Sequence, residues 1–182
     1  MQKSIALCLL FFACAFTVYT KFSITDDQAI QFLQGFSHVF NLDDACDELV
    51  VCVNVTAPQT WADLKNAISD FQHRNFTGGI AELMNFFRDI NELNTTCTEG
   101  VHPYHETFEP ALDAYKKDKI AFEKAVAKNL ASEPVTVAQL AWAFEQSIKK
   151  QDYNAAGESF GQIVEIGLKG YIKEHAFKIS TH

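Results

Sequence analysis

The strongest constraint on the fold is the helical spacing of apolar residues, which recur every three or four positions along most of the chain. The clearest stripe advances in steps of four, three, four and three residues, so that its members share one face of an α-helix. No stretch alternates clearly between polar and apolar residues over six positions. One valine-rich run, residues 49–55, fits either a buried helix end or a single strand. The pattern predicts an all-α fold. The members of the stripe are Phe76, Ile80, Leu83, Phe87 and Ile90.

Polar residues suited to N-capping precede the predicted helices. Thr25 and Gln28 have the spacing of a capping box, in which each side chain accepts a hydrogen bond from the other residue's backbone N–H. Pro134 ends one helix before another begins at Thr136. We therefore predict antiparallel helical hairpins that form a single bundle of about seven or eight helices. The predicted caps are Thr25, Thr60, Asn75, Asp118 and Asp152.

Two segments, residues 73–83 and 150–160, have the same order of residue types. Each has a basic residue, an Asn or Asp cap, an aromatic residue, small residues and then a helix. In a helical hairpin the cap starts the second helix, the aromatic fills the corner, and the small residues let the helices approach closely. A polar stretch near 94–103, which contains Gly100 and Pro103, is predicted to be a loop between two halves of the domain.

The amino end is typical of a secretory signal. Lys3 is followed by an apolar run that is shorter than a membrane-spanning helix requires, and small residues follow it. We predict cleavage after Ala15, with Thr20 as the later alternative and an uncleaved anchor as the rival interpretation. Residues 16–182 are then a single helical domain with a frayed tail after residue 172. The predicted location is extracellular or in the endomembrane lumen, with no stable membrane insertion once the signal is removed.

Removal of residues 1–15 leaves three cysteines, Cys46, Cys52 and Cys97. In an oxidising compartment the simplest arrangement is one disulfide and one remaining thiol. Three Asn-X-Thr sequons agree with a secretory route and predict glycosylation at exposed sites in a eukaryotic pathway. Asn94 lies among polar residues, Asn54 follows the valine-rich run, and Asn75 lies at a predicted helix start that it is expected to cap.

The chain resembles an expanded set of small secreted helical proteins of ciliates. The resemblance rests on the segment Gln31–Phe36, on Cys46, on a helix pair ending at Cys97, and on the segment Asp152–Gly161. It implies an all-helical secreted domain in which Cys46 and Cys97 form the usual cysteine pair, and it implies no activity. Cys52 departs from that pattern.

The composition argues against nucleic acid as a partner. The net charge is −8, and phosphate neutralisation requires clustered Lys and Arg. The chain contains 16 Phe, which is ample material for a core. If the hairpins separate, the same side chains would instead line a cavity for an apolar ligand.

Gly157–Gly161 matches the G-x-S-x-G pattern of a serine nucleophile elbow, with Ser159 as the nucleophile. That elbow requires a strand before the serine, but a capped helix start is predicted there. The favoured interpretation is therefore that two glycines permit close helix packing. His102 and His105, with Glu106 beside them, are the densest group of possible zinc ligands. Their spacing matches neither H-E-x-x-H nor H-x-x-E-H, so a solvated loop is the favoured interpretation.

These observations predict a secreted, non-catalytic binding or interaction module without a cofactor or metal, whose partner is an unknown protein or an apolar ligand. The alternatives are a secreted hydrolase, which would use Ser159 or a metal at His102 and His105, and a structural surface protein that assembles with copies of itself. An intermolecular disulfide through Cys52 would be the sign of that assembly.

Overall fold

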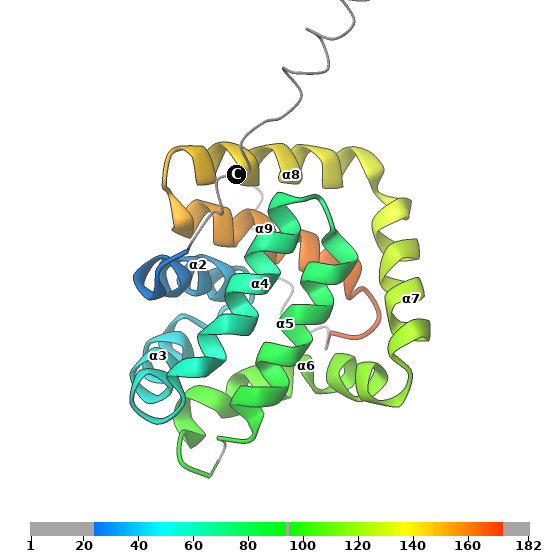
Figure 1. Cartoon of the computed structure of the whole chain (residues 1–182). Helices are drawn as coiled ribbons and strands as arrows, with labels where there is room; N and C mark the ends of the chain where they lie inside the picture. Colours follow the sequence, from blue (N-terminus) through cyan, green and yellow to red (C-terminus); the bar gives the residue numbers. More distant parts are fainter. Residues whose placement is uncertain (1–23, 94, 173–182) are drawn as a thin grey trace, which may run out of the picture.

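The computed structural model describes residues 24–93 and 95–172, and within these ranges the regular structure is helical throughout (Figure 1). The prediction of an all-α bundle is confirmed. The predicted signal segment, residues 1–15, and the predicted tail after residue 172 lie outside the described residues. The elements are α2 (Asp26–Val39), α3 (Asp43–Thr56), the short 3-10 helix η1 (Pro58–Thr60), α4 (Trp61–Gln72), α5 (Phe76–Asn91), α6 (Thr98–Lys117), α7 (Lys119–Ser132), α8 (Pro134–Lys149) and α9 (Tyr153–Gly167).

Helix α9 is the centre of the fold. It packs along α2 and also contacts α5, α7 and α8, and for this reason it is buried on most sides. Figure 1 shows α4 and α5 as a hairpin in front of α2 and α9, with α8 along the upper edge and α7 along one side. Helix α3 packs against α6 and α2, and α6 packs against α5.

The core is a continuous network of aromatic rings from six helices. Phe36 of α2 lies 5.8 Å from Phe160 of α9 and 5.9 Å from Phe108 of α6, measured between ring centroids. Phe108 stacks on Phe87 of α5 at 4.3 Å, while Phe160 lies 4.0 Å from Phe71 of α4. Rings at these separations gain specific aromatic contacts in addition to the burial of apolar area. The network also includes Phe144 of α8, 6.0 Å from Phe71, and Phe32 of α2, 5.0 Å from Phe160.

Four of the five predicted N-caps are confirmed. Thr25 and Gln28 form the full capping box, and three side-chain caps accept a hydrogen bond from the backbone N–H three residues later. Thr60 is the exception. It precedes α4, but its backbone already has helical dihedral angles as part of η1, so its hydroxyl makes no capping bond. The three other caps are Asn75, Asp118 and Asp152.

The predicted likeness of segments 73–83 and 150–160 is confirmed at the level of the backbone. Each contains a residue in the left-handed region, Arg74 with φ 59° and Gln151 with φ 60°, directly before the N-cap. The N–H groups of the two caps donate to equivalent carbonyls, Asn75 to Asp70 and Asp152 to Ser147, both at 2.9 Å. The α4–α5 and α8–α9 hairpins therefore use the same corner.

The loop predicted near 94–103 is shorter than expected, because α6 begins at Thr98 and runs through Pro103 and Pro110. Each proline lacks a backbone N–H, so the carbonyls of Glu99 and Glu106 do not receive the hydrogen bond that a helix normally supplies. Both glutamates are exposed, so water can take the place of the lost donor. Helix α3 likewise contains the whole valine-rich run 49–55, which settles the earlier choice in favour of a helix.

Candidate functional site

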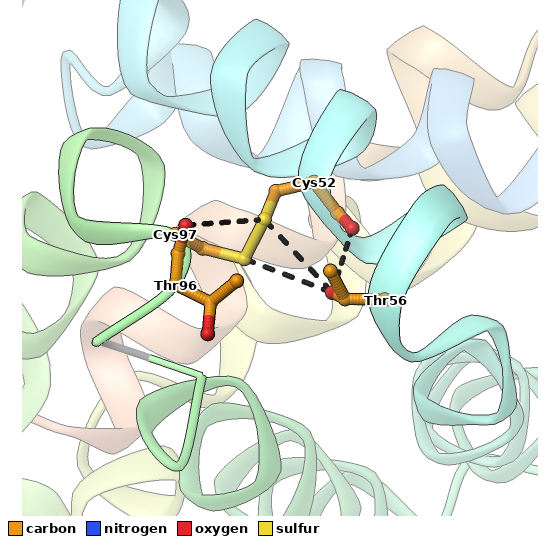
Figure 2. The surroundings of a disulfide bond; sticks show 4 residues. All are labelled: Cys52, Thr56, Thr96 and Cys97. Carbon is orange, nitrogen blue, oxygen red and sulfur yellow. Dashed lines mark hydrogen bonds between the residues drawn. A yellow bond between two sulfur atoms is a disulfide. The ribbon is translucent and has the colours of Figure 1, made fainter.

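The disulfide joins Cys52 of α3 to Cys97 at the start of α6, with the two Cα atoms 5.8 Å apart (Figure 2). The expected pairing of Cys46 with Cys97 is wrong, and Cys46 is a buried free thiol. The reason is the direction of each side chain on α3. Cys46 belongs to the buried stripe with Leu49 and Val53, whereas Cys52 lies off that stripe, next to the turn before α6. The phase of the stripe was the available signal in the sequence.

Thr56 and Thr96 surround the disulfide (Figure 2). The Thr56 hydroxyl donates to the carbonyl of Cys52 at 2.8 Å and lies 3.8 Å from the sulfur of Cys97. Because Cys52 is bonded within the chain, it is not available for the intermolecular disulfide that would have indicated self-assembly.

An open polar groove of about 380 Å³ lies between α2, α3 and α9. His38 and Asp43 both line it, and their Nδ1 and Oδ1 atoms lie 3.2 Å apart. The other polar side chains that line it are Gln34, Asp47, Asn154 and Glu158. The groove thus holds three carboxylates and one imidazole, and its chemistry suits polar or cationic groups better than apolar ones.

Cys46 borders this groove but is only 1% exposed. Burial is the largest influence on its thiol and raises its pKa, despite hydrogen bonds with Ser37 and Tyr104 that act in the opposite direction. The hydroxyls of Ser37 and Tyr104 also hydrogen-bond each other, and Ser37 donates to the carbonyl of Leu33 at 2.6 Å. A buried thiol with a raised pKa stays protonated at neutral pH, so Cys46 is a packing residue and a poor nucleophile.

Ser159 lies in the middle of α9. This position agrees with the prediction that Ser159 is an ordinary helical residue and not a nucleophile. The side chain is 8% exposed, and its hydroxyl donates to the carbonyl of Ala155 at 3.1 Å. The two glycines of the motif face α2. A Cβ atom on Gly157 would lie 2.0 Å from the carbonyl oxygen of Phe32, and one on Gly161 would lie 2.9 Å from a methyl group of Val39.

His102 and His105 both lie on α6, in its first two turns, and not in a loop as expected. Each pairs with the glutamate one turn later. His102 Nε2 lies 3.5 Å from Glu106, and His105 Nε2 lies 3.9 Å from Glu109. Over residues 24–93 and 95–172, no group of three or more His, Cys, Asp or Glu side chains is placed to hold a metal ion.

Two of the three sequon asparagines lie in the described residues, and both are exposed. Asn54 is in the last turn of α3, where its Oδ1 accepts a hydrogen bond from the indole N–H of Trp61 at 2.9 Å. Asn75 caps α5, as predicted, by accepting from the N–H of Gly78 at 3.2 Å. Asn94 lies outside the described residues. Glycosylation stays a prediction at all three positions.

The outer face of α8 is a feature that the sequence reasoning missed. Trp142 is 63% exposed and Val135 is 69% exposed, and Ala138 lies between them on the same side of the helix. Glu145 and Lys149 are the two charged residues of α8, so its first eleven residues carry no charge. A tryptophan opposite the buried residues of a helix was the available signal, because large aromatic side chains are usually buried.

Other exposed apolar side chains have charged or polar surroundings. Val51 and Val55 of α3 are 64% and 79% exposed, but acidic residues precede them and the Asn54 sequon lies between them. Ile120 of α7 is 66% exposed and follows Lys119. Within the described residues, no helix is long and apolar enough to cross a membrane.

The chain has no significant similarity to any protein-family model, curated protein or solved structure with which it was compared.

Proposed function

We propose that the protein is a secreted, non-catalytic interaction module that binds a protein partner through the outer face of α8. The observation that carries this proposal is the exposure of Trp142 and Val135 on a helix whose first eleven residues carry no charge. Tryptophan is among the residues most enriched at the centres of protein interfaces, where it contributes much of the binding free energy.

The aromatic core supports a protein partner over an internal apolar ligand. Phe32, Phe36, Phe108 and Phe160 are each fully buried, and their rings contact one another. These side chains fill the centre of the bundle in the way that ordinary core residues do. A fluorescent fatty acid is therefore expected to show no saturable binding to the purified protein.

Secretion is part of the same proposal. The apolar leader predicted at residues 1–15 supports it, and so does the disulfide between Cys52 and Cys97, because disulfides persist mainly in oxidising compartments. The hydrolase alternative has less support, since the Ser159 hydroxyl is bonded to a helix carbonyl and His102 and His105 each pair with a glutamate.

A photoreactive benzophenone amino acid in place of Trp142 tests the proposed binding face in cells that secrete the protein. Irradiation is expected to join position 142 to a discrete protein partner of defined mass. The matched control carries the same group in place of Ile120, which is 66% exposed on α7 and is expected to give no discrete adduct. Equal labelling patterns from the two positions, or no adduct from position 142, would contradict the proposal.

A further inference from the structure

Asn54 uses only its side-chain oxygen to contact the rest of the fold. This oxygen, Oδ1, accepts a hydrogen bond from the indole N–H of Trp61 at 2.9 Å, and Trp61 is 1% exposed. An indole nitrogen can only donate, so the carboxamide must turn its oxygen toward Trp61. The amide nitrogen Nδ2 takes no part in this contact, and Asn54 itself is exposed. N-linked glycans are attached through this nitrogen, so the folded protein can carry one at Asn54 and keep the bond to Trp61.

Asn75 differs, because its side-chain nitrogen lies against the protein. Its Oδ1 caps α5 by accepting from the N–H of Gly78. A Cβ atom built on Gly78 would lie 2.1 Å from Nδ2 of Asn75 and 2.8 Å from a carboxylate oxygen of Asp70. The nitrogen therefore faces the first turn of α5, where the Asp70 carboxylate is also present. A sugar bonded to this nitrogen has no room unless the Asn75 side chain turns away and gives up the cap.

Two exposed valines lie next to Asn54 on the outside of α3. Val51 is 64% exposed and Val55 is 79% exposed, and they are four residues apart, so they share one side of the helix. Asn54 follows Val51 by three residues, which also makes these two side chains neighbours on the helix surface. A glycan is bulky and hydrophilic. One attached to Asn54 would therefore have both valines within reach and would shield them from solvent.

We propose that Asn54 carries an N-linked glycan that covers Val51 and Val55, whereas Asn75 stays unmodified as a helix cap. The donor is an oligosaccharide linked to a lipid diphosphate. Nδ2 of Asn54 forms a bond to the anomeric carbon of the sugar and loses a proton. The bond from that carbon to the diphosphate oxygen breaks, and the lipid diphosphate leaves with the electron pair, so nothing is oxidised or reduced. This inference rests on secretion, which is part of the proposed function.

Occupancy is tested on the full chain secreted from eukaryotic cells. Peptide N-glycosidase F converts a glycosylated asparagine to aspartate, so peptide mass spectrometry identifies each modified position. The expected result is conversion at position 54 and unchanged asparagine at position 75. Asn54→Asp keeps an oxygen for Trp61 and should lose one glycan, seen as faster migration on a gel. Thr56→Val, which removes the sequon hydroxyl, should lose the same glycan, whereas Thr56→Ser retains the sequon and should keep it.

Shielding of the valines is tested with Nile red, an uncharged dye that fluoresces on apolar surface. The Asn54→Asp variant should bind more dye than the glycosylated protein, and adding Val51→Ser and Val55→Ser should abolish the increase. Ile120→Ser is the matched control, because Ile120 is 66% exposed on a different helix, and it should leave the increase in place. Equal dye binding with and without the glycan would overturn the shielding of Val51 and Val55.

The outcomes separate this inference from the proposed function. Secreted protein with an unmodified Asn54 would overturn the glycan and leave both secretion and the α8 binding face standing. A glycan on Asn75 of the folded, secreted protein would overturn the distinction drawn from the two side-chain nitrogens. Protein that stays in the cytosol with its leader intact and no glycan would remove secretion and this inference together.

Discussion

Gly157 of α9 lies directly against the backbone of Phe32 in α2, such that a Cβ atom at position 157 would be 2.0 Å from the Phe32 carbonyl oxygen. Gly35 of α2 makes the reciprocal approach, because its Cβ would lie 1.9 Å from the carbonyl oxygen of Asn154. The two helices therefore touch backbone to backbone. We expect Gly157→Ala to reduce the free energy of unfolding by about 3 kcal/mol, since neither helix can move aside without disturbing the core.

Gly161→Ala is the control for this effect. A Cβ atom there would lie 2.9 Å from a methyl group of Val39 and 3.3 Å from the carbonyl oxygen of Phe36, so its nearest contact is with a side chain, which can adjust more easily than a backbone carbonyl. We expect this variant to lose less than half of the Gly157→Ala effect. Urea unfolding followed by circular dichroism measures both values. Equal losses would show that close backbone contact is not what limits the spacing of α2 and α9.

The disulfide between Cys52 and Cys97 spans a sequence separation of 45 residues. In the chain-entropy model, loss of a cross-link of this span through Cys52→Ser and Cys97→Ser costs about 4 kcal/mol. Peptide mapping of non-reduced protein should find the 52–97 pair and alkylate Cys46 only after unfolding, because that thiol is buried. No Lys or Arg lies between Cys46 and Cys52, so the mapping requires cleavage after Glu48 to separate them. A disulfide that links Cys46 to either other cysteine would contradict the pairing.

Gln151 has a φ of 60° in the corner between α8 and α9. A residue with a Cβ atom is disfavoured in this left-handed conformation by about 1 kcal/mol, whereas glycine adopts it freely. We therefore expect Gln151→Gly to raise the midpoint of thermal unfolding. The adjacent Lys150 has a φ of −84°, so Lys150→Gly should lower the midpoint through added flexibility of the unfolded chain. Differential scanning calorimetry would reveal this reversal of sign, and a decrease for both variants would contradict the prediction.

Asp63 of α4 hydrogen-bonds Asp89 of α5. Burial raises the pKa of Asp63 to about 6 from an ordinary value of 3.8, and the hydrogen bond and negative charge of Asp89 add to the rise. The nearby charges of Glu82 and Arg88 act in opposite directions, Glu82 to raise the pKa and Arg88 to lower it. The folded protein holds this proton more tightly than the unfolded chain does. The free energy of unfolding should therefore decrease as the pH rises from about 4 to about 6.

Asp63→Asn removes the charge and keeps the shape of the side chain. Because Asp63 is partly exposed, solvent screening reduces the expected gain to about 1 kcal/mol at pH 7.5, with little change at pH 3.5. Asp113→Asn removes the same charge at an exposed position of α6 and is the matched control. Denaturant unfolding of each variant at pH 7.5 and pH 3.5 measures this gain in the free energy of unfolding. An Asp63→Asn variant with the same effect at both pH values would show that the Asp63–Asp89 contact does not destabilise the protein at neutral pH.

The helices were predictable because local chemistry determines them. Thr25, Asn75, Asp118 and Asp152 each cap a helix through their own side chains, and that choice depends on residues only a few positions away. Thr60 failed as a cap because Pro58 begins a preceding 3-10 turn that continues directly into α4. The prediction of a loop near 94–103 was wrong from Thr98 onward, and the reason is a long-range contact. Gly100, which suggested a turn, instead lets α6 approach Leu49, whose backbone N would be 2.4 Å from a Cβ there.

The candidate site was less predictable, because it depends on how the helices face one another. The resemblance to the ciliate proteins implies the wrong cysteine pair, whereas the spacing of Cys46 with Leu49 and Val53 is that of a core residue. The exposure of Trp142 depends on which side of α8 meets α9, and the apolar residues of α8 do not identify that side because they lie around most of the helix. The interpretation of Gly157 as a helix-packing residue was confirmed, because a capped helix start at Asp152 excluded a strand before Ser159.

The pairing of α2 with α9 also bears on the order of events during synthesis. These helices are separated by more than a hundred residues, yet each is a main packing partner of the other. Phe32 and Phe36 of α2 cannot complete their contacts with Phe160 until the ribosome has made α9. Cys52 and Cys97 both emerge well before α9, so oxidative closure between them can hold α3 and α6 together until the last helix enters the core.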